Sequence, residues 1–200
     1  MIVKKFLRRV VKIKNKFGYG YGNNAINSHG LPNDIFEGKG ITVMRRCEID
    51  RNSKIQSYTY IGNNCFISAA NIGKYCSIAN NVSIGMGEHL LSHPSTNSLF
   101  YDNPMEILLK NECIINNDVW IGVDSIIRRG VVIGNGAVIG ANSFVNTNIP
   151  PYAIAVGSPA KVIKYRFTPE QIRLIEETKW WEKDQKDAKK ILEGLDEILF

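Results

Sequence analysis

An aliphatic residue recurs every six positions through much of this chain of 200 residues. The aliphatic positions fall in two blocks, at Val43, Ile49, Ile55, Ile61, Ile67, Ile72, Ile78 and Ile84, and then at Ile115, Ile121, Ile127, Ile133, Ile139 and Val145. Glycine often follows the aliphatic residue, and a small or β-branched residue stands two positions before it. A fixed period of this kind is typical of a solenoid, in which each coil buries its apolar side chains by stacking on the next.

The period excludes simpler architectures. Six residues match neither the 3.6-residue period of a helix nor the roughly 8–12 residues between the turns of a β-sandwich. We therefore expect an all-β solenoid of short straight segments, with Gly and Asn at tight corners. The step from Ile67 to Ile72 is one residue short, which predicts an irregular corner there.

The four cysteines have no paired spacing, so we expect neither disulfides nor a metal site. Cys47, Cys65 and Cys76 occupy the small inward position of the repeat and are expected to be buried. Cys113 is interpreted as a packing residue that lies off this position.

The pattern divides the chain into three parts. Residues 1–40 are expected to form a basic helix and a Gly- and Asn-rich segment, residues 41–165 the solenoid with an insertion over residues 87–113, and residues 166–200 a helical tail. Thr168, Pro169 and Gln171 have the spacing of a capping box at a helix start. A second helix is expected from near Asp184.

Hydrophobic residues make up 44% of the chain, which is too much for disorder. No apolar run reaches the roughly 18 residues of a membrane span, and no signal-peptide pattern is present, so we expect a cytoplasmic protein. The net charge is +6, and seven basic residues crowd the first sixteen positions. This start predicts either contact with the inner face of a membrane or packing on a neighbouring subunit. Without a nucleic-acid motif, we expect no nucleic-acid partner.

The stretch NDVWIGVDSIIRRGVVIGNGAVIGANSFVNTNIPPYAIAVGSPAKVIKYRF resembles the hexapeptide-repeat acyltransferases, and the resemblance covers about residues 41–181. The insertion with His89 and Ser95-Thr96, and the tail with Trp180-Trp181, resemble the branch of xenobiotic acetyltransferases and polysaccharide O-acetyltransferases. The resemblance implies a left-handed parallel β-helix, a homotrimer and acetyl-CoA as the acyl donor.

The resemblance aligns His89 with the catalytic histidine of that branch. An imidazole titrates near neutral pH, which suits a base that takes the proton of an acceptor hydroxyl. His93 is expected either to bind the acceptor or to brace the loop, and Phe100 and Tyr101 either to stack on a sugar ring or to anchor the loop. His29, in the Gly- and Asn-rich segment, is expected to be exposed.

CoA is expected to lie along the second block of repeats. The small residues Gly122, Gly140 and Ala141 would let its pantetheine arm approach the backbone. Trp120 is expected either to pack on this arm or to plug a corner of the coil. Lys161 and Arg166 are expected either to bind the phosphate groups of CoA or to remain solvated. The residues expected to contact CoA are Trp120, Gly122, Gly140, Ala141, Lys161 and Arg166.

The leading interpretation is an acetyl-CoA-dependent O-acetyltransferase that acts on a sugar hydroxyl in surface-polysaccharide biosynthesis, by direct transfer in a ternary complex. The alternative is the same chemistry on an antibiotic of the chloramphenicol or streptogramin type. A γ-type carbonic anhydrase is a remote alternative, because His89 and His93 lack the spacing of that family's pair. A non-catalytic β-helix that serves as a scaffold or an ice-binding surface predicts flat outward Thr arrays, and the outward positions here are mostly Asn, Lys, Arg and Asp.

Overall fold

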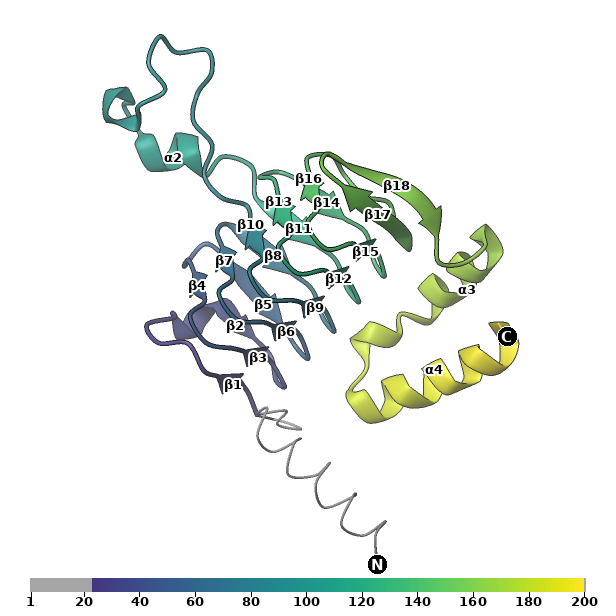
Figure 1. Ribbon diagram of the computed structural model, residues 1–200. Coiled ribbons are helices and arrows are strands. Elements are labelled where there is room, and N and C mark those ends of the chain that lie inside the picture. The colour runs from purple at the N-terminus through teal and green to yellow at the C-terminus, as the bar shows by residue number, and fades with distance from the viewer. Residues whose placement is uncertain (1–22, 200) are drawn as a thin grey trace, which may run out of the picture.

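The computed structural model describes residues 23–199, which form a parallel β-helix of stacked triangular coils followed by two helices (Figure 1). The three sides of the triangle are three sheets. In spatial order, the first sheet contains β1 (Ala25–Ile26), β3 (Thr42–Val43), β6 (Tyr60–Ile61), β9 (Ser77–Ile78), β12 (Trp120–Ile121), β15 (Val138–Ile139), β17 (Ala153–Gly157) and β18 (Ala160–Tyr165).

The second sheet contains β16 (Phe144–Val145), β13 (Ile126–Ile127), β10 (Ser83–Ile84), β7 (Phe66–Ile67) and β4 (Glu48–Ile49). The third sheet contains β14 (Val132–Ile133), β11 (Cys113–Ile115), β8 (Ala70–Ile72), β5 (Lys54–Gln56) and β2 (Phe36–Glu37). The chain passes from the first sheet to the second, then to the third, and back to the first. We call these three turns the first, second and third corners.

Stacked aliphatic side chains form the core. Ile61 lies beside Ile78, and Ile78 beside Ile121, in the register of neighbouring parallel strands, and all three are buried. Each coil thus removes its inward aliphatic residues from water only through its neighbours. This architecture confirms the predicted all-β solenoid, a left-handed parallel β-helix.

The solenoid begins earlier than expected. Strands β1 and β2 pair with β3 and β5, so the first coil lies before the predicted start at residue 41. Its second side is an irregular segment with the 3-10 helix η1 (Asn33–Ile35) instead of a strand. The six-residue period is therefore absent from this coil. Ser28 joins it to the next coil, since its hydroxyl donates to the Met44 carbonyl oxygen and accepts from the Cys47 N–H.

Cys113 packs in the core, as interpreted, but the expectation that it lies off the small position of the repeat was wrong. It lies in β11 directly beside Ala70, is fully buried, and occupies the small inward position of its coil. It stands two positions before Ile115, which is the small position of the repeat. Cys47, Cys65 and Cys76 are buried, as predicted.

The short step before Ile72 produces the predicted irregular corner, where Ala69 has a φ of 41°. The insertion leaves one coil farther on, at the same corner, between β10 and β11. It contains the 3-10 helix η2 (Ser98–Phe100) and the helix α2 (Pro104–Leu108), and it projects beyond the coils (Figure 1).

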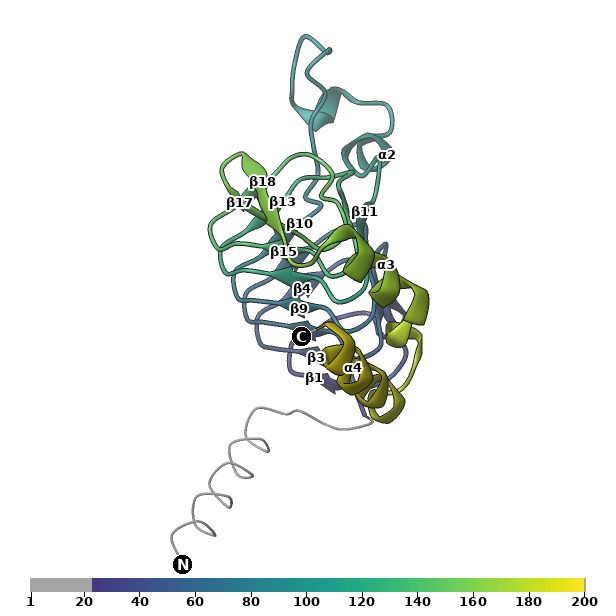
Figure 2. The same ribbon diagram turned by 90° about the vertical axis from the view of Figure 1, so that its right-hand side faces the viewer.

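The tail packs along one edge of the solenoid (Figure 2). It comprises α3 (Pro169–Thr178), the 3-10 helix η3 (Trp180–Glu182) and α4 (Gln185–Leu199). The predicted capping box at Thr168 and Gln171 is present. Trp180 and Trp181 are buried, and the Trp180 ring lies 5.1 Å from the Tyr75 ring at the third corner. Among residues 23–199, no helix is long and apolar enough to cross a membrane. The predicted basic helix and its membrane contact lie outside the described residues.

Candidate active site

A buried arginine joins both ends of the insertion to the coils. Arg129 is 8% exposed. Its guanidinium donates hydrogen bonds to the carbonyl oxygens of Gly85 and Met86, where the chain leaves the solenoid, and of Leu109, where it returns. It also donates to the Ser68 hydroxyl at 3.1 Å. Burial lowers the pKa of Arg129, but an arginine remains protonated near neutral pH. We call Arg129 with these hydrogen bonds the clamp of the insertion. The sequence pattern does not identify it, because two adjacent arginines at a corner resemble ordinary surface charges.

The neighbouring Arg128 holds the insertion from outside. Its guanidinium makes two hydrogen bonds to the Glu88 carboxylate, at 2.6 and 2.8 Å, and this partner raises the pKa of Arg128. Both side chains are about half exposed, so the pair adds little to overall stability. Its geometric effect is local: it fixes the residue that precedes His89.

Tyr101 anchors the insertion between two histidines. It is 7% exposed. Its hydroxyl accepts a hydrogen bond from the Leu90 N–H at 3.0 Å and donates one to the Thr96 carbonyl oxygen at 2.9 Å. Its ring centroid lies 6.4 Å from that of His89 and 5.8 Å from that of His93. The burial of the ring within its own loop favours the anchoring alternative for Tyr101 over stacking on a sugar.

The other predicted loop residues differ in exposure. His93 is half-buried, and its Nδ1 lies 2.8 Å from the Ser95 carbonyl oxygen and 3.1 Å from the Ser95 nitrogen. This contact favours the bracing role for His93. His89 is exposed, and Phe100 is 64% exposed at the end of η2. Only His89 and Phe100 of the predicted loop residues therefore present side chains that are open to a ligand.

Two glycines of the predicted CoA site are required by coil stacking. A Cβ at Gly122 would lie 2.6 Å from the Ala141 nitrogen, and a Cβ at Gly140 would lie 2.6 Å from Cγ1 of Val156. These contacts point along the stack, so they give a reason for glycine that is independent of a pantetheine arm. Ala141, in contrast, is exposed at the same first corner. Contact of these residues with CoA stays a prediction.

Lys161 and Trp120 lie near that corner. Lys161 is exposed and pairs across the β17–β18 hairpin with Val156, whose side chain faces Gly140. Trp120 is 56% exposed on the outer face of β12. This exposure favours contact with a ligand over the alternative that Trp120 plugs a corner, because the indole offers an open apolar surface.

Arg166 has a structural role in the described chain. Its Nη1 donates to the Gly136 carbonyl oxygen at 2.7 Å and to the Asp118 carboxylate at 3.3 Å. The guanidinium also lies 5.1 Å from the Phe167 ring centroid and 5.8 Å from that of Tyr152. Burial raises the pKa of Asp118, and the charge of Arg166 opposes that shift. These contacts at the third corner favour packing beneath α3 over the predicted role in phosphate binding.

The predicted site residues thus lie at three different corners. The loop of His89 leaves from the second corner, Gly122 and Gly140 are at the first with Lys161 beside them, and Arg166 is at the third. The strands of the second sheet separate the first corner from the second. A single chain therefore does not bring His89 to the predicted CoA corner.

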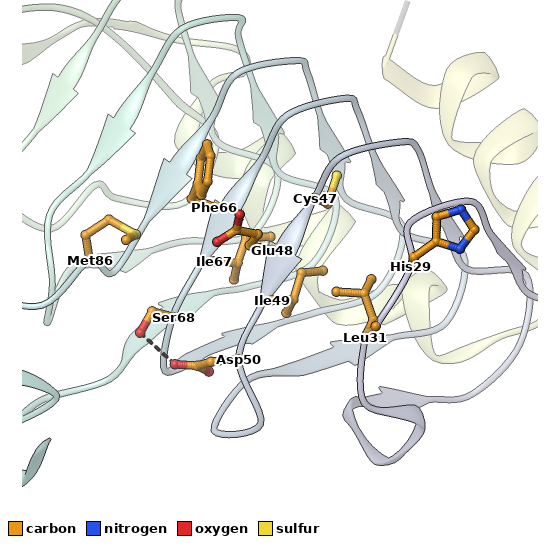
Figure 3. A pocket seen from close by; sticks show the side chains of 11 residues that line it. His29, Leu31, Cys47, Glu48, Ile49, Asp50, Phe66, Ile67, Ser68 and Met86 are labelled. Atoms are coloured by element: carbon orange, nitrogen blue, oxygen red, sulfur yellow. Dashed lines mark hydrogen bonds between the residues drawn. The ribbon is translucent and has the colours of Figure 1, made fainter.

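A cavity of about 400 Å³ lies on the outer face of the second sheet (Figure 3). Its lining includes Glu48, Phe66 and Met86, which the sequence pattern did not mark as functional. His29 also lines it and is exposed, as predicted. Within residues 23–199, no three His, Cys, Asp or Glu side chains form a group that could hold a metal ion.

Comparison with known proteins gives two kinds of relative. The family model for the bacterial transferase hexapeptide (six repeats) matches residues 112–147. A chloramphenicol acetyltransferase of Klebsiella aerogenes is 40% identical over 121 residues, which are 55% of this chain and 58% of that protein. The matched segment thus spans little more than half the length of that relative. WbbJ of Escherichia coli K12, described as a lipopolysaccharide biosynthesis O-acetyl transferase, is 31% identical over 90% of this chain and 84% of its own length.

Among solved structures, AntD of Bacillus cereus has a similar fold. AntD is an N-acyltransferase whose crystal structure contains dTDP and 3-hydroxybutyryl-CoA. It superposes with a TM-score of 0.56, over 78% of this chain and 83% of the other, at 22% identity. At this identity, the likeness is one of fold.

Proposed function

This chain belongs to the hexapeptide-repeat acyltransferase family, and from that premise we propose that it transfers an acetyl group from acetyl-CoA to a sugar hydroxyl of a surface polysaccharide. The observation that carries the proposal is the match to WbbJ, which extends over 90% of the chain and so includes at least part of the insertion as well as the repeats. A sugar acceptor is favoured over other hydroxyl compounds because that relative is named for lipopolysaccharide biosynthesis.

His89 is the general base. It takes the proton of the acceptor hydroxyl as that oxygen attacks the thioester carbonyl, and the resulting imidazolium returns a proton to the departing CoA sulfur. The products are an acetyl ester and CoA, so no covalent enzyme intermediate is needed. The exposed ring, the contact with Tyr101 and the Arg128–Glu88 pair beside it support this role, because a base must be held in position yet open to the acceptor.

Acetyl-CoA lies at the first corner, along Gly122, Gly140 and Ala141, with the pantetheine arm near Trp120 and a phosphate near Lys161. Because the second sheet separates this corner from the base of the insertion, the thioester reaches His89 of a neighbouring copy. The active unit is then a homotrimer, in which each site takes the donor corner from one chain and the base from the next.

An antibiotic hydroxyl is the second candidate acceptor. The 40% identity to a chloramphenicol acetyltransferase supports it, and the chemistry at His89 is the same. The two candidates differ in the acceptor alone, so a direct comparison of acceptors separates them.

The test is a thiol-release assay with acetyl-CoA against a panel of oligosaccharides, chloramphenicol and streptogramin A. We expect release with a sugar acceptor, and loss of release in His89→Ala while calorimetry still detects CoA binding. His93→Ala controls for disturbance of the loop, because it removes the other histidine and its contact with Ser95 but no proposed proton acceptor, so it should retain thiol release that His89→Ala loses. Turnover that survives His89→Ala would refute the mechanism, and an active species with the mass of one chain in sedimentation would refute the shared site.

A further inference from the structure

The cavity on the second sheet extends from the N-terminal coil to the start of the insertion. His29 and Leu31 lie at one end and Met86 at the other, with Glu48 and Phe66 between them (Figure 3). Its volume of about 400 Å³ is within the range of roughly 300–1,000 Å³ that is usual for small-molecule sites. It is thus large enough for a sugar ring, and strands β4 and β7 form its middle.

Carboxylates supply the charge of this cavity. Glu48 is exposed on the outer face of β4. Asp50 is held in place, because its carboxylate accepts hydrogen bonds from the hydroxyl groups of Ser68, at 2.6 Å, and of Ser53, at 2.9 Å. The lining residues of the cavity include no Lys or Arg. The buried Arg129 donates to the Ser68 hydroxyl behind the lining and offsets the charge of Asp50. The uncompensated charge that a ligand meets is therefore that of Glu48, which attracts hydroxyl donors and repels anions.

Apolar side chains supply the remaining walls. Phe66 is 37% exposed and Met86 is 46% exposed, and Leu31 is half-buried at the opposite end. An open aromatic ring beside a carboxylate matches a pyranose, which has an apolar face of C–H groups and an edge of hydroxyl groups.

We infer that this cavity binds one uncharged sugar ring of the acceptor, and that it disfavours a uronic acid. Phe66 and Met86 cover the apolar face of the ring, and Glu48 accepts hydrogen bonds from its hydroxyl groups. The inference rests on the proposed acetyl transfer and adds the charge class of the acceptor to it.

The position of the cavity fits delivery of the acceptor to the base. Met86 precedes His89 by three residues, so their Cα atoms are at most about 11 Å apart. Arg129 fixes the Met86 end of this connection through the Met86 carbonyl oxygen. A ring in the cavity can therefore extend a neighbouring hydroxyl group towards the loop of the same chain.

The experiment compares pairs of methyl glycosides that differ only at C6. Saturation-transfer NMR on the full chain at pH 7.5 measures binding of methyl glucoside against methyl glucuronide, and of methyl galactoside against methyl galacturonide. We expect the neutral member of a pair to bind roughly fivefold more tightly, which is the effect of one like charge at about 4 Å in a solvent-like medium. Glu48→Gln should reduce that preference, and Phe66→Ala should weaken both members.

Ile126→Ala is the matched control, since Ile126 is 49% exposed on the same sheet but outside the cavity. It should leave all four affinities unchanged. Equal binding of the acidic and neutral rings, or a preference that Glu48→Gln does not change, would overturn the inference. Sugar binding is measured independently of turnover. If the protein binds neutral sugars selectively but releases no thiol, the proposed acetyl transfer would be refuted and the sugar site would not.

Discussion

Replacement of Arg129 by methionine should loosen the insertion and lower the stability of the whole domain. Methionine retains an unbranched apolar stem, so the substitution removes mainly the guanidinium. The carbonyl oxygens of Gly85, Met86 and Leu109 then lose a charged donor. Because these groups lie at both ends of the insertion, the change should first release residues 86–112 from the coils.

The magnitude follows from the burial of the three carbonyl groups. Gly85 is buried, so its orphaned oxygen costs about 2 kcal/mol. Met86 is exposed and Leu109 is half-buried, so water replaces the lost donors in part, at about 0.5 kcal/mol each. The total is about 3 kcal/mol, which for a domain of this size lowers the Tm by about 6–12 °C.

Thermal unfolding and amide hydrogen exchange measure the two effects. Arg128→Met is the control, because it removes the adjacent arginine and its exposed ion pair, worth less than about 1 kcal/mol and less than about 4 °C. In Arg129→Met, exchange should rise first in residues 86–112. Equal shifts of Tm in the two variants, or an unchanged exchange rate in the insertion, would refute the assignment of Arg129 as the clamp.

Three further predictions concern the stack, the loop and a buried thiol. Gly122→Ala should lower the free energy of unfolding, measured in urea, by about 1–3 kcal/mol, because the new Cβ would overlap the next coil. Gly194→Ala is the control: its Cβ meets nothing within 4 Å, so this change should be neutral or stabilising. Tyr101→Phe should raise the rate of amide hydrogen exchange in residues 90–101 by about fivefold, because loss of the hydroxyl group costs about 1 kcal/mol. An unchanged exchange rate would contradict the anchoring role of Tyr101. Burial raises the pKa of Cys76 to about 12, so iodoacetamide should label this thiol at pH 8 only after unfolding. The contribution of Cys76 to the free energy of unfolding should fall as the pH rises from 9 towards 12. Rapid labelling of Cys76 in the folded protein would contradict this prediction.

The sequence period predicted the core well, because a position in a solenoid coil has nearly the same environment in every coil. Ile61, Ile78 and Ile121 are equivalent in sequence and adjacent in space. The prediction failed where the period is interrupted. The first coil has a long irregular side, so it could not be assigned a register from its neighbours in the chain. Cys113 follows the insertion, and its register is readable only from Ile115, two positions after it.

The site was less predictable, because its side chains depend on contacts between segments far apart in the sequence. Tyr101 and Phe100 are adjacent aromatic residues, yet one is buried between two histidines and the other is open. Arg128 and Arg129 are adjacent and identical, yet one pairs with Glu88 at the surface and the other is buried against backbone carbonyl groups. No local pattern distinguishes the members of either pair.

The sequence by itself determined the solenoid, its inward residues and the position of the insertion, since these follow from a repeated local preference for short strands and tight corners. Tertiary structure decided which corner each candidate residue occupies, because the corner depends on the count of residues around a triangular coil, including its irregular sides. It separated His89 from Gly140 and gave Arg166 a packing partner. It also placed Glu48 and Phe66 beside Met86, where three coils and the N-terminal segment meet.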